Sequence, residues 1–259
     1  MKGKMLALSR PRRILTDLSH ASLGYPRATL TTRIDIGALV APRAALPAGA
    51  RVPWPVVFAK AFALVARDMA HLRRVYVKLP WPHFYELPTS VASIIIERDW
   101  PEAAPVEQAL FLARLKDPAS GTLADSAAAL RRYKTAPIDS IADFRRILAI
   151  AALPLPLRRL ALFLALNLGR QVPNYFGTFA ISPLGSHGAA ILDTIPVWTS
   201  FLNYGPIGPD GRVDVYLSVD HRVMDGGHAA RAITAMETIL NGVVLTELRR
   251  MAAEQDVLF

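Results

Sequence analysis

One stretch near the C-terminus constrains the fold of this chain more than any other, because a strand pattern there passes directly into a helix pattern. Residues 213–219 alternate apolar and polar side chains, as a strand with one buried face does, whereas residues 228–240 repeat apolar side chains at helical spacing. Between the two patterns lie His221 and the sequence Asp225-Gly226-Gly227, where glycine accepts the positive φ that a tight turn requires. We therefore expect His221 at a junction between a strand and a helix, a position often used for active-site residues.

The residues at this junction suit general-base chemistry. A neutral imidazole takes up a proton near neutral pH, so His221 is a candidate base. Asp225 follows His221 by four residues. Its carboxylate either orients the imidazole or pairs with an arginine and locks the turn, and the residues alone leave both roles open.

Two motifs resemble those of a known family. Residues 220–226, Asp-His-Arg-x-x-Asp-Gly, resemble the catalytic motif of the acyltransferase component of 2-oxo acid dehydrogenase complexes and, more distantly, those of chloramphenicol acetyltransferase and the condensation domains. Residues 176–185, Phe-Gly-Thr-Phe-Ala-Ile-Ser-Pro-Leu-Gly, are similar to a second strand motif of that family, and residues 12–14 and 26–31 resemble its first helix and strand more weakly. The resemblance spans the catalytic domain and implies an α/β fold, a chloramphenicol acetyltransferase-like mixed sheet with flanking helices, assembled as a trimer or a larger cage.

The resemblance also implies roles for individual residues. His221 would deprotonate the acceptor, and the hydroxyl of Ser182, with Thr178 as the alternative, would stabilise the oxyanion of the tetrahedral intermediate. Family sites lie between subunits, with the histidine from one and the serine from its neighbour. Asp225 would hold the turn through an ion pair with an arginine. The candidate arginines are Arg12, Arg13 and Arg27.

Other candidate site residues carry weaker signals. Gly226 is expected beside the substrate, and His187 either is an ordinary loop residue or lines an acceptor pocket. Pro183 stands where the family has asparagine, and the segment between Ser182 and His221 is short for the family, so we expect a different substrate geometry. His228 is expected on the helix that follows the turn, as a surface or interface residue.

The implied activity is transfer of an acyl group from acyl-CoA or an acyl-carrier thioester to a hydroxyl, amine or thiol, with no tightly bound cofactor. The dehydrogenase-complex enzymes carry N-terminal lipoyl domains, whereas this sequence reads as a flexible arm over residues 1–10 and one catalytic domain over residues 11–259. We therefore expect a stand-alone acyltransferase whose acceptor is unidentified. The apolar residues 148–175 and the positive charge favour a lipid or amphipathic acceptor or a long-chain donor. A catalytically silent trimeric scaffold and a membrane-surface adaptor are the alternatives.

Composition narrows the partners. The net charge of +9 and a sequence pI near 10.2 suit a nucleic acid, an anionic membrane or an anionic molecule such as coenzyme A, but the arginines are scattered and no nucleic-acid motif is present, so we expect no nucleic-acid partner. The absence of cysteine excludes thiol catalysis and disulfides. His20, His71 and His83 lack metal-ligand spacing, so we expect no metal. The apolar stretch within the first ten residues is too short for a secretory signal, so we expect a cytoplasmic protein.

The apolar segment 148–175 is the least family-like part of the chain. Prolines and an arginine pair interrupt it, so it does not read as a membrane-spanning helix. Two interpretations stay open: a buried helix or subunit contact, or a surface that meets lipid or a long acyl chain, with Arg158, Arg159 and Arg170 facing anionic headgroups. Elsewhere the patterns predict strands over residues 28–36, 73–77 and 90–97, helices over 12–20, 54–67, 105–115, 123–133 and 138–150, and a loop over 41–53.

Overall fold

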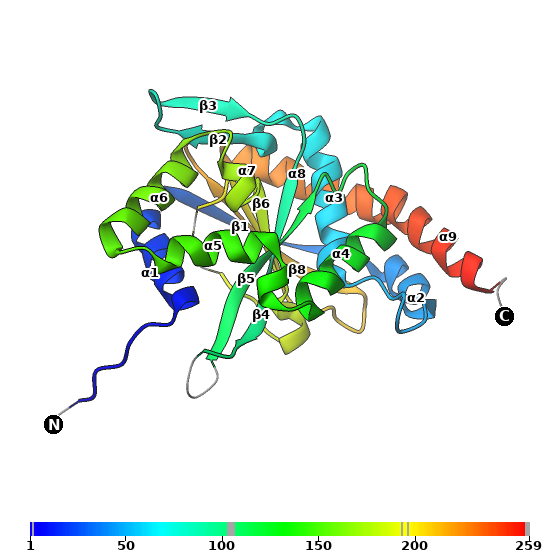
Figure 1. Cartoon of the computed structure of the whole chain (residues 1–259). Coiled ribbons are helices and arrows are strands. Elements are labelled where there is room, and N and C mark those ends of the chain that lie inside the picture. The colour runs from blue at the N-terminus through cyan, green and yellow to red at the C-terminus, as the bar shows by residue number, and fades with distance from the viewer. Residues whose placement is uncertain (2, 103–106, 193, 196, 257–259) are drawn as a thin grey trace.

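The computed structural model describes residue 1 and residues 3–102, 107–192, 194–195 and 197–256. Its centre is a six-stranded mixed sheet in the order β1-β8-β7-β6-β4-β5 (Figure 1). The strands are β1 (Arg27–Asp35), β4 (Val91–Trp100), β5 (Glu107–Lys116), β6 (Phe179–Ser182), β7 (Ser200–Tyr204) and β8 (Arg212–Asp220). A separate hairpin joins β2 (Arg74–Val77) to β3 (His83–Glu86).

The sheet opens between β4 and β6. These two strands are parallel and pair only over Ala92–Ile94 of β4, opposite Phe179–Ile181 of β6. Beyond this point β4 continues to Trp100 paired with β5 alone, while β6 stays paired with β7 through Ser182 and Asn203. Ser182 therefore lies where the sheet divides.

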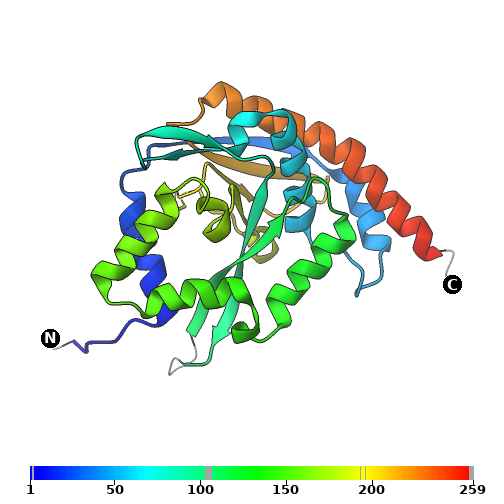
Figure 2. The same cartoon turned by 45° about the horizontal axis from the view of Figure 1, so that its top comes forward.

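Helices cover both faces of the sheet (Figures 1 and 2). One core cluster packs α3, α4 and α8 against alternate residues of the strands, and the second packs α1, α5 and α6 against the opposite face. The helices are α1 (Arg10–Ser22), α2 (Gly37–Ala45), α3 (Trp54–Asp68), α4 (Leu123–Thr135), α5 (Ala142–Ala152), α6 (Leu155–Asn167), α7 (Val172–Tyr175), α8 (Gly226–Ile239) and α9 (Leu245–Asp256). Single turns of 3₁₀-helix occur at η1 (Ala70–Arg73), η2 (Ile138–Ser140) and η3 (Leu184–His187), and a π-helical turn, η4 (Leu240–Val244), joins α8 to α9.

The helix α3 forms the centre of the larger core. Its sequence is apolar on every side, which suits a helix enclosed on all sides, and residues 55–66 are all buried. The one charge among them, Lys60, donates to Gly121 O at 2.6 Å and pairs with Glu247 at 2.8 Å. A buried charge needs such partners, because an unpaired one is strongly destabilising.

Most predicted elements are confirmed, and two are wrong. Residues 107–115, predicted as helix, belong to β5, whose Ala109, Phe111, Ala113 and Leu115 alternate into the core. Pairing with β4 along the whole strand overrides the high helix propensity of this Ala/Leu-rich segment. Residues 41–45, predicted as loop, end α2, which accommodates a proline at position 42.

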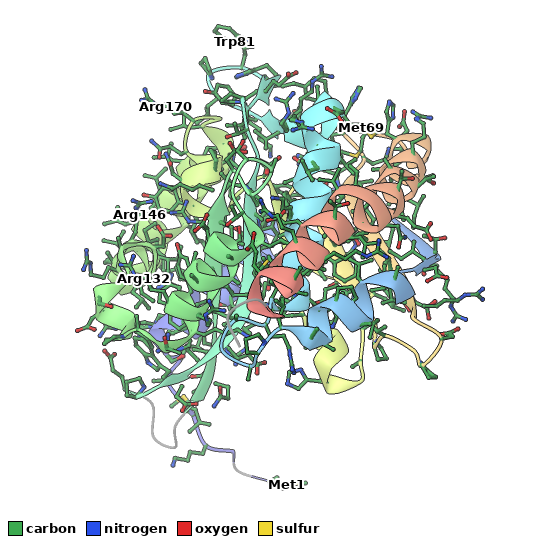
Figure 3. All side chains as sticks on the ribbon, turned by 90° about the vertical axis from the view of Figure 1, so that its right-hand side faces the viewer. Met1, Met69, Trp81, Arg132, Arg146 and Arg170 are labelled. Atoms are coloured by element: carbon green, nitrogen blue, oxygen red, sulfur yellow. The ribbon has the colours of Figure 1, made fainter. Side chains whose placement is uncertain are left out.

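The apolar segment 148–175 forms parts of α5, α6 and α7. The inner side of α6 is buried, but its outer side exposes Leu155, Leu157, Leu160, Phe163 and Leu164, and Leu168, directly after the helix, is exposed as well. The prediction that Arg158 faces a headgroup is wrong, because its guanidinium is buried in an ion pair with Asp17. Arg159 and Arg170 are exposed, and Figure 3 shows Arg170 and Arg146 along the same side of the molecule. Whether lipid or a subunit covers this side stays a prediction.

No helix in the described ranges is both long and apolar enough to cross a membrane. Before α1, the chain extends away from the body (Figure 1), and the helix starts where the Ser9 hydroxyl accepts from Arg12 N.

Candidate active site

His221 lies at the predicted junction, in the turn that connects β8 to α8. Its backbone N–H donates to Pro26 O at 2.9 Å, which ties the turn to the start of β1. The N–H groups of Val223 and Met224 both donate to Asp220 O, at 2.9 and 3.2 Å, and close the turn. These bonds fix the backbone that presents the imidazole.

The carboxylate of Asp225 lies beside the imidazole of His221. Asp225 Oδ1 is 3.2 Å from His221 Nδ1, and the two side chains are 50% and 75% exposed, respectively. A carboxylate at this distance favours the tautomer with a proton on Nδ1, so the lone pair of the neutral ring is on Nε2. The geometry is thus that of a base held by a carboxylate, open to solvent on one side in the isolated chain.

The predicted arginine partner of Asp225 is wrong. Arg12 pairs with Glu107 at 3.0 Å, Arg13 donates to a backbone carbonyl in the N-terminal arm, and Arg27 donates to Thr194 O. Within the described residues, the ion pair of Asp225 is with His221.

Arg222 takes the locking role that was expected of an arginine beside Asp225. Its guanidinium donates two charge-assisted bonds to the Asp220 carboxylate, with an NH2–Oδ2 distance of 2.6 Å. It also lies between two aromatic rings, 4.2 Å from the centroid of Tyr25 and 4.5 Å from that of Tyr76. The Asp220 side chain is only 5% exposed, so this pair anchors the turn in the body of the protein. Sequence reasoning missed Arg222, although it adjoins His221.

Ser182, the candidate oxyanion donor, lies at the end of β6 and is nearly buried. It borders the main cavity, and no hydrogen bond to its hydroxyl occurs within the described part of the chain. Its strand begins beside β4 because Gly177 has a φ of +80° and a Cβ there would be 2.6 Å from Val91 O. The hydroxyl of Ser182 is therefore placed on a rigid strand and faces a cavity.

Thr178, the alternative donor, has a different task. It is fully buried, and its hydroxyl both accepts from Val91 N at 3.0 Å and donates to Val91 O at 3.2 Å. Thr178 is absent from the cavity wall. Its bonds hold β4 to the chain just before β6, which makes an oxyanion role less suitable for it than for Ser182.

The cavity next to Ser182 has a volume of about 1020 Å³ and fills the opening between β4 and β6. Apolar residues of α1, β4, β5, α5 and the loop before β7 make up most of its wall. His187, in η3, borders the cavity and is solvent-exposed, and its role in an acceptor pocket stays a prediction. His221 is not among the lining residues, so one chain does not bring His221 and Ser182 together in this cavity.

Gly226 and His228 begin α8. Nothing lies within 4 Å of a Cβ built on Gly226, so the local packing does not demand glycine, and its role beside a substrate stays a prediction. His228 is partly buried rather than on the surface, with its ring centroid 4.4 Å from that of His71. Burial, and then the nearby positive groups led by His228, lower the pKa of His71 below its ordinary value.

Asn203 is a residue that the sequence reasoning missed. It lies opposite Ser182 in the β6–β7 pairing, is 1% exposed, and neither its Oδ1 nor its Nδ2 has a partner among the described residues. Buried amides normally have hydrogen-bond partners, so Asn203 is an additional candidate for a functional position beside Ser182. The sequence signal is an asparagine inside the otherwise apolar run of residues 201–204.

The described residues contain no cluster of three or more histidines and carboxylates placed to hold a metal ion. No protein-family model and no curated protein matches the sequence.

Solved structures do match the fold. A probable dihydrolipoamide acetyltransferase from Listeria monocytogenes superposes with a TM-score of 0.66 at 17% identity, over 92% of this chain and 94% of that one. The dihydrolipoamide acetyltransferase of Azotobacter vinelandii gives a TM-score of 0.66 at 19% identity, over 93% of each chain. The protein has the fold of these acetyltransferase cores. A catalytic core of the 2-oxoacid dehydrogenase complex from Thermoplasma acidophilum shares this acetyltransferase-core fold, with a TM-score of 0.64 at 18% identity over 93% of this chain and 99% of that one. The predicted mixed sheet with flanking helices is confirmed.

Proposed function

We propose that this protein is an acyltransferase that moves an acyl group from a thioester to a hydroxyl, amine or thiol. The observation that carries the proposal is the contact between Asp225 and His221 Nδ1, which leaves Nε2 as the basic nitrogen, in a chain with the acetyltransferase-core fold. The positive net charge supports acyl-CoA or a phosphopantetheine-linked carrier as the donor, because both carry phosphate. Neither donor is a tightly bound cofactor.

His221 acts as the general base in this reaction. The proton of the acceptor passes to Nε2 while the acceptor's oxygen, nitrogen or sulfur bonds to the thioester carbonyl carbon. The carbon–sulfur bond then breaks, and the leaving thiolate takes the proton from the imidazolium. Asp225 keeps the ring in the correct tautomer and stabilises its positive charge during the reaction.

Ser182 donates its hydroxyl to the oxyanion of the tetrahedral intermediate. A strand end is a rigid support for such a donor, and its hydroxyl is uncommitted in the described part of the chain. In the Azotobacter vinelandii enzyme, a serine, a histidine and an asparagine four residues after that histidine have been studied for their role in catalysis. Ser182, His221 and Asp225 offer a similar set here, with a carboxylate in place of the amide.

The complete site lies between two copies of the chain, in a trimer or larger assembly. Half of the His221 side chain is open to solvent, whereas Ser182 is nearly buried and borders a cavity that His221 does not line. An active site that excludes water is not formed around His221 in a single chain, because half of this side chain is open to solvent. A neighbouring copy that brings its Ser182 cavity against His221 completes the site.

Turnover of acyl-CoA tests the proposal. Acyl-CoAs of several chain lengths are offered to the wild type with an alcohol, an amine or dihydrolipoamide as acceptor, with and without a lipid extract, and free CoA is measured by chromatography. We expect turnover in the wild type and a loss of about 10²–10⁴-fold in His221→Ala. The matched control is His20→Gln, which changes an exposed histidine of α1 and should leave the rate unchanged.

Two outcomes contradict the proposal. Equal rates in the wild type and His221→Ala remove the base from the mechanism. No turnover with any donor and acceptor favours the silent scaffold instead, and binding of the protein to anionic liposomes in a flotation experiment would then favour the membrane adaptor.

A further inference from the structure

The cavity beside Ser182 is a consequence of the divided sheet. After Ile94, β4 and β5 leave the plane of β6 and β7, so the wall includes residues from both faces of the strands, such as Ile95 with Ile96 and Leu112 with Phe111. In an undivided sheet, neighbouring residues of a strand point to opposite faces and do not line one space. The opening therefore leads from Ser182 into the interior, between the two core clusters.

Many of the buried residues of the wall are apolar. On one side lie Ile14 and Leu18 of α1 with Trp198 and Phe201, all less than 10% exposed. Ile147 of α5 completes this side and packs against both core clusters. Such a surface binds hydrocarbon, because removal of apolar area from water is its main source of affinity.

The arginines of the wall are held by other groups. Arg12 pairs with Glu107 at 3.0 Å, and Arg114 pairs with Asp143, which also accepts from the Tyr133 hydroxyl.

Arg43 lies 4.6 Å from the ring centroid of Trp54, and its Nε donates to Val52 O at 2.6 Å. Glu97 and Lys134 are exposed. The interior of the cavity therefore favours an uncharged, hydrocarbon ligand.

We propose that this cavity holds the hydrocarbon chain of a long-chain acyl thioester whose carbonyl lies at Ser182. The inference rests on the proposed function, because it places the donor's carbonyl at the oxyanion residue. A volume of about 1020 Å³ is at the upper end of the range of about 300–1,000 Å³ that is common for ligand pockets, and is far larger than an acetyl group requires. The substrate class is thus a fatty acyl thioester rather than acetyl-CoA.

Donor selectivity provides the first test. We expect kcat/KM to rise from acetyl-CoA through octanoyl-CoA to palmitoyl-CoA, by at most about threefold to fourfold for each added methylene that is fully buried. Ile147→Trp should fill part of the cavity and lower kcat/KM for palmitoyl-CoA at least about tenfold. The rate with acetyl-CoA should not change, because its acyl group ends near Ser182. Ile239→Trp is the matched control, since Ile239 is also a half-buried isoleucine on a helix but lies outside the cavity wall.

Binding provides a second test that does not need turnover. Palmitate is titrated calorimetrically into His221→Ala, alone and combined with Ile147→Trp. We expect palmitate to bind with a negative heat-capacity change, the mark of apolar burial, and the combined variant to bind at least about tenfold more weakly. If Ile147→Trp does not fold, as judged by circular dichroism, Leu112→Phe replaces it.

The outcomes separate this inference from the proposed function. Turnover of acetyl-CoA without turnover of palmitoyl-CoA overturns the inference and leaves the acyltransferase. An equal loss with every donor in Ile147→Trp also overturns it, because the cavity then holds the acceptor. Binding of palmitate that Ile147→Trp weakens, without any turnover, supports the cavity as a fatty-acyl site while the proposed function fails. No palmitate binding overturns the inference whether or not acetyl-CoA is turned over.

Discussion

The two halves of the proposed site differ in the forces that build them. The His221 half is polar and compact in sequence: residues 220–225 provide the base, its orienting carboxylate and the Asp220–Arg222 pair, and the imidazole is half exposed. The Ser182 half is apolar and dispersed: its cavity wall comes from segments between Pro11 and Ile207. Interactions within residues 220–225, with contacts to Pro26, Tyr25 and Tyr76, define the first half, whereas the wall of the second comes entirely from segments that are distant in the sequence.

This difference predicts opposite responses to mutation. His221 and Asp225 are exposed, so changing them should affect catalysis with little effect on stability. Residues around Ser182 are buried in the core clusters, so changing them should affect stability, ligand size and catalysis together.

The largest effect is expected when the two halves are inactivated in separate chains. Trimers of His221→Ala and trimers of Ser182→Ala should each lose about 10²–10³-fold or more in turnover. If each site takes His221 from one subunit and Ser182 from the next, random mixed trimers should recover roughly a quarter of the wild-type activity, because that fraction of sites receives both intact residues. Turnover measured after joint unfolding and refolding checks this.

The control for the mixing experiment is the wild type refolded by the same protocol. Recovery of the control without any recovery in the mixture would show that both residues of a site come from one chain. The contrast between an exposed and an enclosed half would then describe one subunit, and not an interface.

The His221 half of the site could be predicted from the sequence better than the Ser182 half. The position of His221 and its proximity to Asp225 could be predicted because all of the necessary residues lie within one strand, one turn and the start of one helix. The partner of Asp225 could not be predicted, because an arginine forms its ion pair with whichever carboxylate the packed elements bring near it: Arg12 meets Glu107 across α1 and β5.

The Ser182 cavity was beyond prediction for a related reason. It depends on β5, which has apolar residues on both faces: Leu110 and Leu112 border the cavity from one face, and Phe111, on the other face, borders it too and packs in the larger core cluster. This arrangement removes the apolar–polar alternation that identifies a strand, and residues 105–115 therefore resemble a helix in sequence. The separation of β4 from β6 leaves no local pattern in the amino-acid sequence.

The next largest effect is expected from Arg222→Met. This change leaves the Asp220 carboxylate buried, with the backbone N–H of residue 222, 3.0 Å from Asp220 Oδ1, as its remaining donor. It also removes the cation–π contacts of Arg222 with Tyr25 and Tyr76. We expect a loss in the free energy of unfolding that approaches the ~3–5 kcal/mol typical of a broken buried pair. Urea unfolding measures it.

The matched control is Arg33→Met. Arg33 also pairs with a carboxylate, Asp214 at 2.7 Å, but both side chains are exposed, so no measurable change is expected. An Arg222→Met protein as stable as the control would contradict the anchoring role of Arg222.

Asn203→Leu should have a smaller effect of opposite sign on stability. The Asn203 amide is buried without partners among the described residues, and leucine fits a site of similar size. Removing the unpaired amide should raise the free energy of unfolding by about 1–3 kcal/mol. Because Asn203 lies opposite Ser182, we also expect turnover to fall about tenfold, the pattern of a polar group kept for function. A less stable variant would mean that the amide has a partner in the assembled protein.

The smallest expected effect is a pH dependence of stability at His71, near the anchored turn but outside both halves. Burial and then His228 and Arg74 lower the pKa of His71, with Glu86 opposing them and Arg231 adding to them. A lowered pKa means that the unfolded chain takes up the proton more readily. The contribution of neutral His71 to the free energy of unfolding is therefore fully present above the ordinary pKa of 6.5. It is lost as the pH falls through the lower pKa that His71 has in the folded protein. His71→Gln should flatten the decline in Tm between about pH 7 and pH 5 by no more than about 2 °C, because the ring is only partly buried. His20→Gln should leave the decline unchanged, and an unaltered decline in His71→Gln would assign it to other groups.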